Sequence, residues 1–140
     1  MLRRLGLVLL IVAAACAAPP APAADDPPAA NLALQGTRWV MRIDDAPPRT
    51  EAPTLEFSAE GRAGGFTGCN QWFAQIEQAN GGLSFHSVGV TRRACEAPAM
   101  DIERAFSESL AHTRSAQRDG DDLILFGEEA EQLARFMPAA

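Results

Sequence analysis

Three cysteines are the residues of this chain with the widest choice of chemistry. Cys69 lies in a Gly-Cys-Asn tripeptide, Cys95 ends a Thr-Arg-Arg-Ala-Cys segment, and Cys16 ends an apolar leader. A cysteine thiolate can form a disulfide, bind a metal ion or act as a nucleophile. The compartment of the protein and the neighbours of each cysteine favour one of these uses over the others.

The leader around Cys16 has the order of a bacterial secretory signal. Arg3 and Arg4 precede the uncharged apolar run Leu5–Ala15, and small residues and prolines follow. The run is shorter than the roughly 20 residues that span a hydrocarbon core, so residues 1–16 are predicted to be a signal peptide that directs export. Small residues directly before Cys16 resemble a lipobox, which predicts a lipidated cysteine. Cleavage at a later Ala-x-Ala site, giving a free periplasmic protein, is the alternative.

Residues 17–30 consist almost wholly of alanine, proline and aspartate. Such a segment has too little bulky apolar surface to fold, and its prolines stiffen it. It is therefore predicted to be a tether, which leaves residues 31–140 as one small domain.

The other two cysteines favour a disulfide. An even pair in an exported chain is typical of a structural crosslink, so Cys69 and Cys95 are expected to pair. Neither has a second cysteine or a histidine at ligand spacing, which disfavours a metal site. A Cys–His nucleophile would need His86 or His112, and exported free thiols tend to oxidise.

Charge restricts the partners that the protein can bind. The chain has 12 basic and 18 acidic residues, a net charge of −6, and its arginines are scattered. Nucleic acids and anionic lipids both require clustered positive charge. We therefore expect no nucleic-acid partner, membrane contact only through the N-terminal lipid, and a monomer.

Short strands separated by turns account for most of the domain. Apolar and polar residues alternate in several segments, the prolines of 44–53 predict a loop, and Asn80-Gly81 predicts a hairpin. Gly64 and Gly65 lie inside one expected strand, which indicates a bulge or a close backbone approach. Strands are expected over residues 37–43, 54–58, 62–67, 70–78, 83–90, 123–126 and 132–137.

One helix is expected at about 97–112. Pro98 suits a first helical position, and an apolar stripe follows at helical spacing. That stripe consists of Ile102, Phe106 and Leu110, with Ala105 and Ser109 beside them. The predicted fold class is α+β: a curved antiparallel sheet or partly open β-barrel with this one helix packed on it.

The ordered motifs of residues 31–140 resemble the META domain, or HslJ-like family, of small bacterial envelope proteins. They are Leu34-x-Gly36-Thr37-x-Trp39, Gly68-Cys69-Asn70, Thr91-Arg92-x-Ala94-Cys95 and Pro98-x-Met100-x-x-Glu103-x-x-Phe106. The resemblance implies a disulfide between the two domain cysteines and frequent lipidation. It also implies roles in heat shock, novobiocin resistance, secretion or motility. Arg93 departs from the family pattern, which has a small hydrophobic residue there, and is predicted to reach solvent.

Asn70, Thr91 and Arg92 are the polar residues best placed, beside the cysteines, to form an exposed interaction surface. The alternative is that Asn70 bonds local backbone as a turn residue while Thr91 and Arg92 hold the crosslinked loop. The sequence contains no catalytic serine, histidine-metal or phosphate-loop motif. It therefore predicts a non-enzymatic protein with no cofactor and no metal.

Three functions remain open from the sequence. The first is an envelope module that binds an unknown envelope protein in stress tolerance, antibiotic resistance or envelope assembly. The second is a carrier of a small apolar ligand in the mouth of an open barrel, which a core filled by aromatic side chains would contradict. The third is a thiol enzyme using Cys69 or Cys95.

Overall fold

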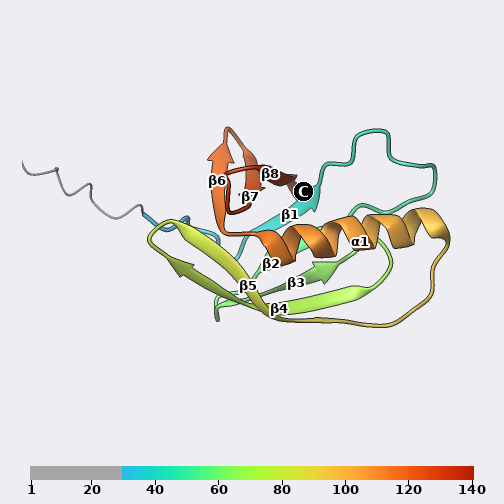
Figure 1. The fold of residues 1–140 in the computed structure, drawn as a ribbon, viewed down its shortest axis with the longest axis horizontal. Helices are drawn as coiled ribbons and strands as arrows, with labels where there is room; N and C mark the ends of the chain where they lie inside the picture. The colour runs from blue at the N-terminus through green and yellow to red at the C-terminus, as the bar shows by residue number, and fades with distance from the viewer. Residues whose placement is uncertain (1–29) are drawn as a thin grey trace, which may run out of the picture.

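The computed structural model describes residues 30–140, and its centre is a sheet of eight antiparallel strands that closes into a ring. Each strand pairs with its sequence neighbour, and the first strand also pairs with the last (Figure 1). The elements are β1 (Arg38–Met41), β2 (Thr54–Phe57), β3 (Arg62–Phe66), β4 (Gln71–Ala79), β5 (Gly82–Val90), α1 (Ala97–His112), β6 (Ser115–Asp119), β7 (Asp122–Phe126) and β8 (Gln132–Pro138).

The ring is weakest between β5 and β6. These strands share a single register pair, Gly82 with Ser115, and α1 comes between them in the chain. In Figure 1 the helix runs across the sheet, and it contacts β5 and β8. The predicted curved antiparallel sheet with one packed helix is confirmed, and this seam is where the ring is most open.

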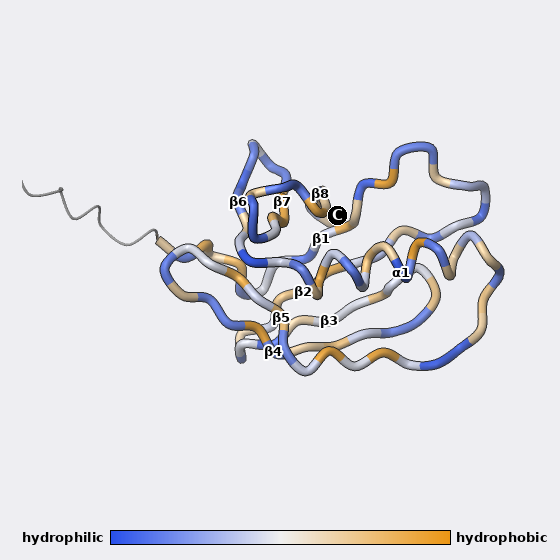
Figure 2. Tube along the Cα trace, in the orientation of Figure 1, coloured by the Kyte–Doolittle hydropathy of each residue, from blue (hydrophilic) through white to orange (hydrophobic). Residues whose placement is uncertain are grey.

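Local sequence explains the tight turns. Asn80 and Gly81 both have positive φ, 52° and 77°, as a two-residue hairpin between twisted strands requires. The hydrophilic residues gather at such turns and in the loop after β1 (Figure 2). Gly65 has a φ of 149°, and a Cβ there would collide with the Thr54 carbonyl. The close backbone approach predicted for the glycine pair is therefore present.

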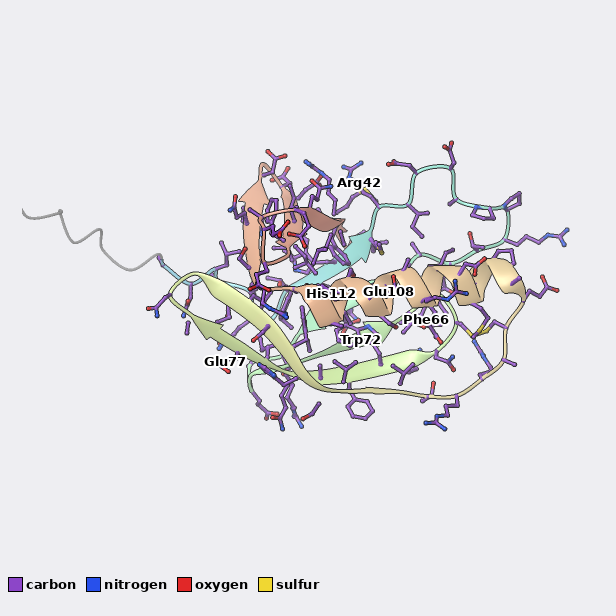
Figure 3. The ribbon with its side chains drawn as sticks, viewed as in Figure 1. Arg42, Phe66, Trp72, Glu77, Glu108 and His112 are labelled. Atoms are coloured by element: carbon purple, nitrogen blue, oxygen red, sulfur yellow. A yellow bond between two sulfur atoms is a disulfide. The ribbon has the colours of Figure 1, made fainter. Side chains whose placement is uncertain are left out.

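Aromatic side chains fill the interior of the ring. The Trp72 ring lies between the sheet and α1 (Figure 3), with its centroid 5.4 Å from that of Phe106. Phe106 in turn lies 6.4 Å from Phe136. A core filled by aromatic side chains contradicts a ligand carrier, and four such side chains are buried here: Trp39, Phe57, Phe85 and Phe106. The core thus occupies the space that the carrier hypothesis needed.

Two details of the prediction are wrong. Ala105 is exposed, because the buried side of α1 is narrower than the predicted stripe and consists of Phe106, Ser109 and Leu110. Strand β6 was not expected. Its burial pattern leaves three of its five residues exposed, so the sequence carries little of the alternation that marks a half-buried strand.

The predicted signal peptide, Cys16 and nearly all of the predicted tether lie outside the described residues. Within residues 30–140, the one helix is too short and too polar to cross a membrane. In the same residues every buried side-chain nitrogen or oxygen has a hydrogen-bond partner.

Candidate functional site

A disulfide joins Cys69 to Cys95, as predicted. The S–S bond is 2.00 Å and the Cα atoms are 6.0 Å apart. Cys69 lies between β3 and β4, and Cys95 lies between β5 and α1. The crosslink therefore connects two irregular segments at the end of the β4–β5 pair that leads into the helix.

The Asn70 side chain forms the centre of a hydrogen-bond network beside the disulfide. Its Oδ1 accepts from the Arg93 N–H at 2.7 Å and from Thr91 Oγ1 at 3.1 Å. Its Nδ2 donates to the Glu103 carboxylate at 2.9 Å and to the Arg93 carbonyl at 3.1 Å. One amide thus fixes the segment after β5 and ties it to α1.

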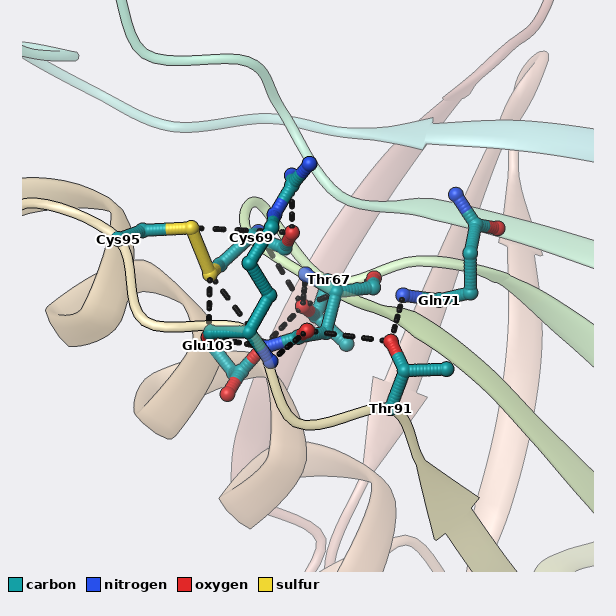
Figure 4. Close-up of a disulfide and its surroundings, with 8 residues drawn as sticks. Thr67, Cys69, Gln71, Thr91, Cys95 and Glu103 are labelled. Carbon is teal, nitrogen blue, oxygen red and sulfur yellow. Dashed lines mark hydrogen bonds between the residues drawn. A yellow bond between two sulfur atoms is a disulfide. The ribbon is translucent and has the colours of Figure 1, made fainter.

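Thr67 and Glu103 complete this network (Figure 4). The Thr67 hydroxyl is fully buried and accepts from the backbone N–H groups of Asn70 and Cys69 at 2.8 and 3.2 Å. It lies 2.5 Å from the Glu103 carboxylate, to which it donates. Charge-assisted hydrogen bonds of this kind are among the stronger ones in proteins. We call the set of Thr67, Asn70, Thr91, Arg93 and Glu103 the Asn70 network.

The exposure predicted for Asn70 is wrong. Its relative exposure is 4%, because its amide is surrounded by the groups that it bonds. The alternative interpretation, a residue that organises local backbone, describes it better. The contacts of Glu103 with Asn70 and Thr67 were not predicted, because they join residues more than 30 positions apart.

Thr91 and Arg92 are exposed, as expected. Thr91 is partly structural, since its hydroxyl also accepts from the Gln71 N–H at 3.1 Å. Arg92 forms no hydrogen bond or ion pair with another described residue. Arg93 reaches solvent, as predicted, yet its guanidinium also donates to the Cys69 carbonyl at 2.7 Å.

A shallow depression of about 550 Å³ lies over the Asn70 network. Apolar side chains and two arginines share its lining, and Val88, at 41% exposure, is among the most exposed large hydrophobic residues described. The lining residues are Asn70, Val88, Val90, Thr91, Arg92, Arg93, Ala94, Met100 and Glu103. We call this depression with its arginines the Arg92 surface.

Comparison with known proteins identifies the domain. The model of the META domain family matches residues 32–140. The chain belongs to the META domain family. The resemblance inferred from the motifs is therefore confirmed, and membership indicates a bacterial envelope-associated protein. The search of curated proteins finds no match.

Two solved structures share the fold of this META domain. An NMR structure of a protein from Burkholderia xenovorans is 24% identical, with a TM-score of 0.61, over 88% of this chain and 99% of that one. A crystal structure of a DUF4847 family protein from Bacteroides vulgatus is 12% identical, with a TM-score of 0.55, over 75% of this chain and 94% of that one. At such identities the likeness concerns the fold.

The groups of the Asn70 network mainly hold backbone in place. Each polar group donates to or accepts from another member of the network. In the disulfide form neither sulfur is a free thiol, so the crosslinked META domain offers no nucleophile at these two positions. Among residues 30–140 no cluster of three or more His, Cys, Asp or Glu side chains is arranged to hold a metal ion.

A second polar cluster in the META domain joins the end of β6 and the start of β7 to β8 and to the residue that follows β1. Its members are Arg42, Asp119, Asp122 and Arg135, and we call it the Asp122 cluster. The Asp122 carboxylate accepts from Arg135 Nε at 2.7 Å and from Arg42 Nε at 3.1 Å. These hydrogen bonds, with Arg135 contributing most, lower the pKa of Asp122 below its ordinary value. Arg135 also donates to Asp119 at 2.7 Å. Asp122 itself is buried.

Proposed function

We propose that this META domain protein is an exported, non-enzymatic envelope protein that binds another envelope protein through the Arg92 surface. Its role would be in envelope stress tolerance, novobiocin-type antibiotic resistance or envelope assembly. The observation that carries the proposal is the contrast between Asn70, whose amide is used entirely for positioning, and Arg92, which is exposed on the backbone that Asn70 fixes. Because the backbone that carries Arg92 is already ordered, binding requires only the Arg92 side chain to become ordered.

The composition of the Arg92 surface indicates the kind of partner. Val88, Val90 and Met100 supply apolar area, and Arg92 and Arg93 supply positive charge in an otherwise acidic chain. Interfaces are enriched in arginine, and their buried centres are more apolar than the surrounding surface. A protein segment with an apolar side chain beside a carboxylate would satisfy both features.

Export and anchoring are part of the same proposal. The leader with Arg3 and Arg4, the apolar run that follows, and Cys16 support a lipidated protein held in the periplasm by the tether 17–30. An acyl chain contributes about 0.8 kcal/mol for each buried CH₂ group. Metabolic palmitate labelling of wild type and Cys16→Ser tests the anchor, and equal labelling of the two would contradict lipidation.

Site-specific crosslinking in living cells tests the interaction. A photoreactive residue is placed at Arg92 in the full-length protein, and a matched control is placed at Asp121, an exposed turn residue next to β7. We expect a discrete heavier adduct from position 92 under envelope stress and none from position 121. An Arg92→Glu substitution should weaken capture of the same partner. Monomer alone from position 92, under stress and without it, would contradict the proposal.

A further inference from the structure

A row of outward-facing residues crosses the sheet on another face of the molecule. The strand register pairs Arg38 with Glu56, Glu56 with Gly64, Gly64 with Phe73, and Phe73 with Gly89. The neighbours of Phe73 on β4, Trp72 and Ala74, are buried, so Phe73 points away from the core. In this row the Arg38–Glu56 ion pair lies on one side of Gly64, and the Phe73 ring lies on the other side.

The Phe73 ring lies over Gly89. A Cβ at Gly89 would collide with the end of the ring, so the glycine makes room for the aromatic side chain on β5. A Cβ at Gly64 would first meet the Trp72 carbonyl and the Cα and Cβ of Phe73, whereas at Gly89 it would first meet ring atoms, so the ring leans toward β5. The phenylalanine remains 62% exposed, and its outer face is open to solvent.

The space above Gly64 is a shallow groove of about 760 Å³. Phe73 bounds it on one side, and Arg38 and Glu56, joined by an ion pair of 2.7 Å, bound it on the other. Gln71 and Gln75 lie two residues before and after Phe73 on β4 and therefore share its outward face. We call this space the Phe73 groove.

The polar groups of the groove suit a neutral ligand with many hydroxyl groups. The side-chain amides of Gln71 and Gln75 form no hydrogen bond with other described residues, and each amide offers both donors and an acceptor. Arg38 adds donors and Glu56 adds acceptors, with opposite charges that balance. Arg62 also lines the groove, and its guanidinium is paired with the Glu60 carboxylate. Each positive charge therefore already has a carboxylate partner, which disfavours a phosphate or an anionic lipid as the ligand.

The position of the groove disfavours an extended peptide. Peptides that add to a sheet do so at an unpaired strand edge, whereas β2, β3 and β4 each pair with a strand on both sides. The backbone N–H and C=O groups of these strands are therefore already engaged in ladder hydrogen bonds and cannot pair with the backbone of a peptide. Only side chains are available to a ligand on this face.

We propose that the Phe73 groove binds a glycan, with the C–H face of a pyranose ring stacked on Phe73. An aromatic face carries partial negative charge and attracts polarised C–H groups. The sugar hydroxyls exchange hydrogen bonds with Gln71, Gln75 and the Arg38–Glu56 pair. The open shape of the groove allows a chain of sugars to continue beyond the stacked unit. The inference goes beyond the proposed function and concerns a different surface.

A pull-down of the full-length protein on insoluble polysaccharides tests the inference, with chitin, cellulose and purified bacterial sacculi as probes. We expect retention on at least one probe. Phe73→Leu keeps an apolar cover on Gly89 but removes the aromatic face, and should weaken retention about tenfold. Phe73→Trp should retain binding, and Gln75→Leu should weaken it. Arg92→Glu should bind as wild type does, which separates this inference from the proposed function.

Two results would overturn the inference. One is no retention of the wild-type protein on any of the three probes. The other is equal retention of wild type, Phe73→Leu and Gln75→Leu. Thermal unfolding of each variant establishes that it is folded. If Phe73→Leu does not fold, the comparison of wild type with Gln75→Leu decides the question.

Discussion

The Asn70 network and the Asp122 cluster both fasten separate parts of the chain, but by different means. The Asn70 network joins irregular segments to α1 through an amide, a carboxylate and a disulfide. The Asp122 cluster adds ion pairs to strands that already share ladder hydrogen bonds. Irregular backbone has no ladder to replace a lost side-chain bond. The first region should therefore depend on its side chains far more than the second.

Removing the disulfide should have the largest effect. Closing a loop with a sequence separation of 26 stabilises by about 3.5 kcal/mol in the chain-entropy model. The double variant Cys69→Ala/Cys95→Ala should therefore unfold at a lower urea concentration than wild type. Reductant should lower the wild-type midpoint and leave that of the variant unchanged. An unchanged wild-type midpoint in reductant, with reduction verified by thiol labelling, would contradict this prediction.

Asn70→Ala should have the next largest effect. It leaves the Arg93 N–H and the Thr67–Glu103 pair without their amide partner, and buried unsatisfied groups cost about 1–3 kcal/mol each. We expect a loss of about 3 kcal/mol in urea unfolding. Gln75→Ala removes an amide of similar size from an exposed site and should change stability by less than about 0.5 kcal/mol. Similar losses for the two variants would mean that the Asn70 network does not hold the loop.

Asp122→Asn should alter the acid response more than the fold. Because its arginine partners lower the pKa of Asp122, its contribution is present above the ordinary carboxyl pKa of about 3.9. It is lost as the pH falls through the lowered pKa of the folded state. Wild type should therefore lose stability over this acid range more steeply than Asp122→Asn. Parallel pH profiles of the two proteins would contradict the assignment.

Arg92→Ala should have the smallest effect on stability. Arg92 is exposed and has no partner among the described residues, and such surface substitutions usually change stability by less than about 0.5 kcal/mol. Thermal and urea unfolding should match wild type even where crosslinking to a partner is lost. A large loss of stability would place Arg92 with Asn70 as a structural residue.

Local patterns in the sequence predicted most of the fold. The helix bounds of 97–112, the Asn80-Gly81 hairpin and the alternating strands are all present. These features depend on residues close together in the chain. Strand β6 was not predicted because its outward residues are polar and Ala116 is its one buried residue.

The candidate site was harder to predict because its contacts are distant in sequence. Asn70 bonds Arg93 and Glu103, which are 23 and 33 residues away. A polar amide next to a glycine and a cysteine is typical of an exposed turn, and only the folded chain supplies the groups that bury it. The same holds for Asp122, whose partner Arg42 is 80 residues away.

The pairing of β1 with β8 has a consequence for the order of folding. Trp39, Val40 and Met41 pair with Pro138, Met137 and Phe136, so the first strand finds one of its two neighbours only when the last strand is available. Contacts this distant in sequence slow folding, because loop closure costs entropy before the pairing compensates for it. A chain that is made from its N-terminus onward would expose one edge of β1 until β8 follows. That unpaired strand edge is open to aggregation and to proteases until β8 pairs with it.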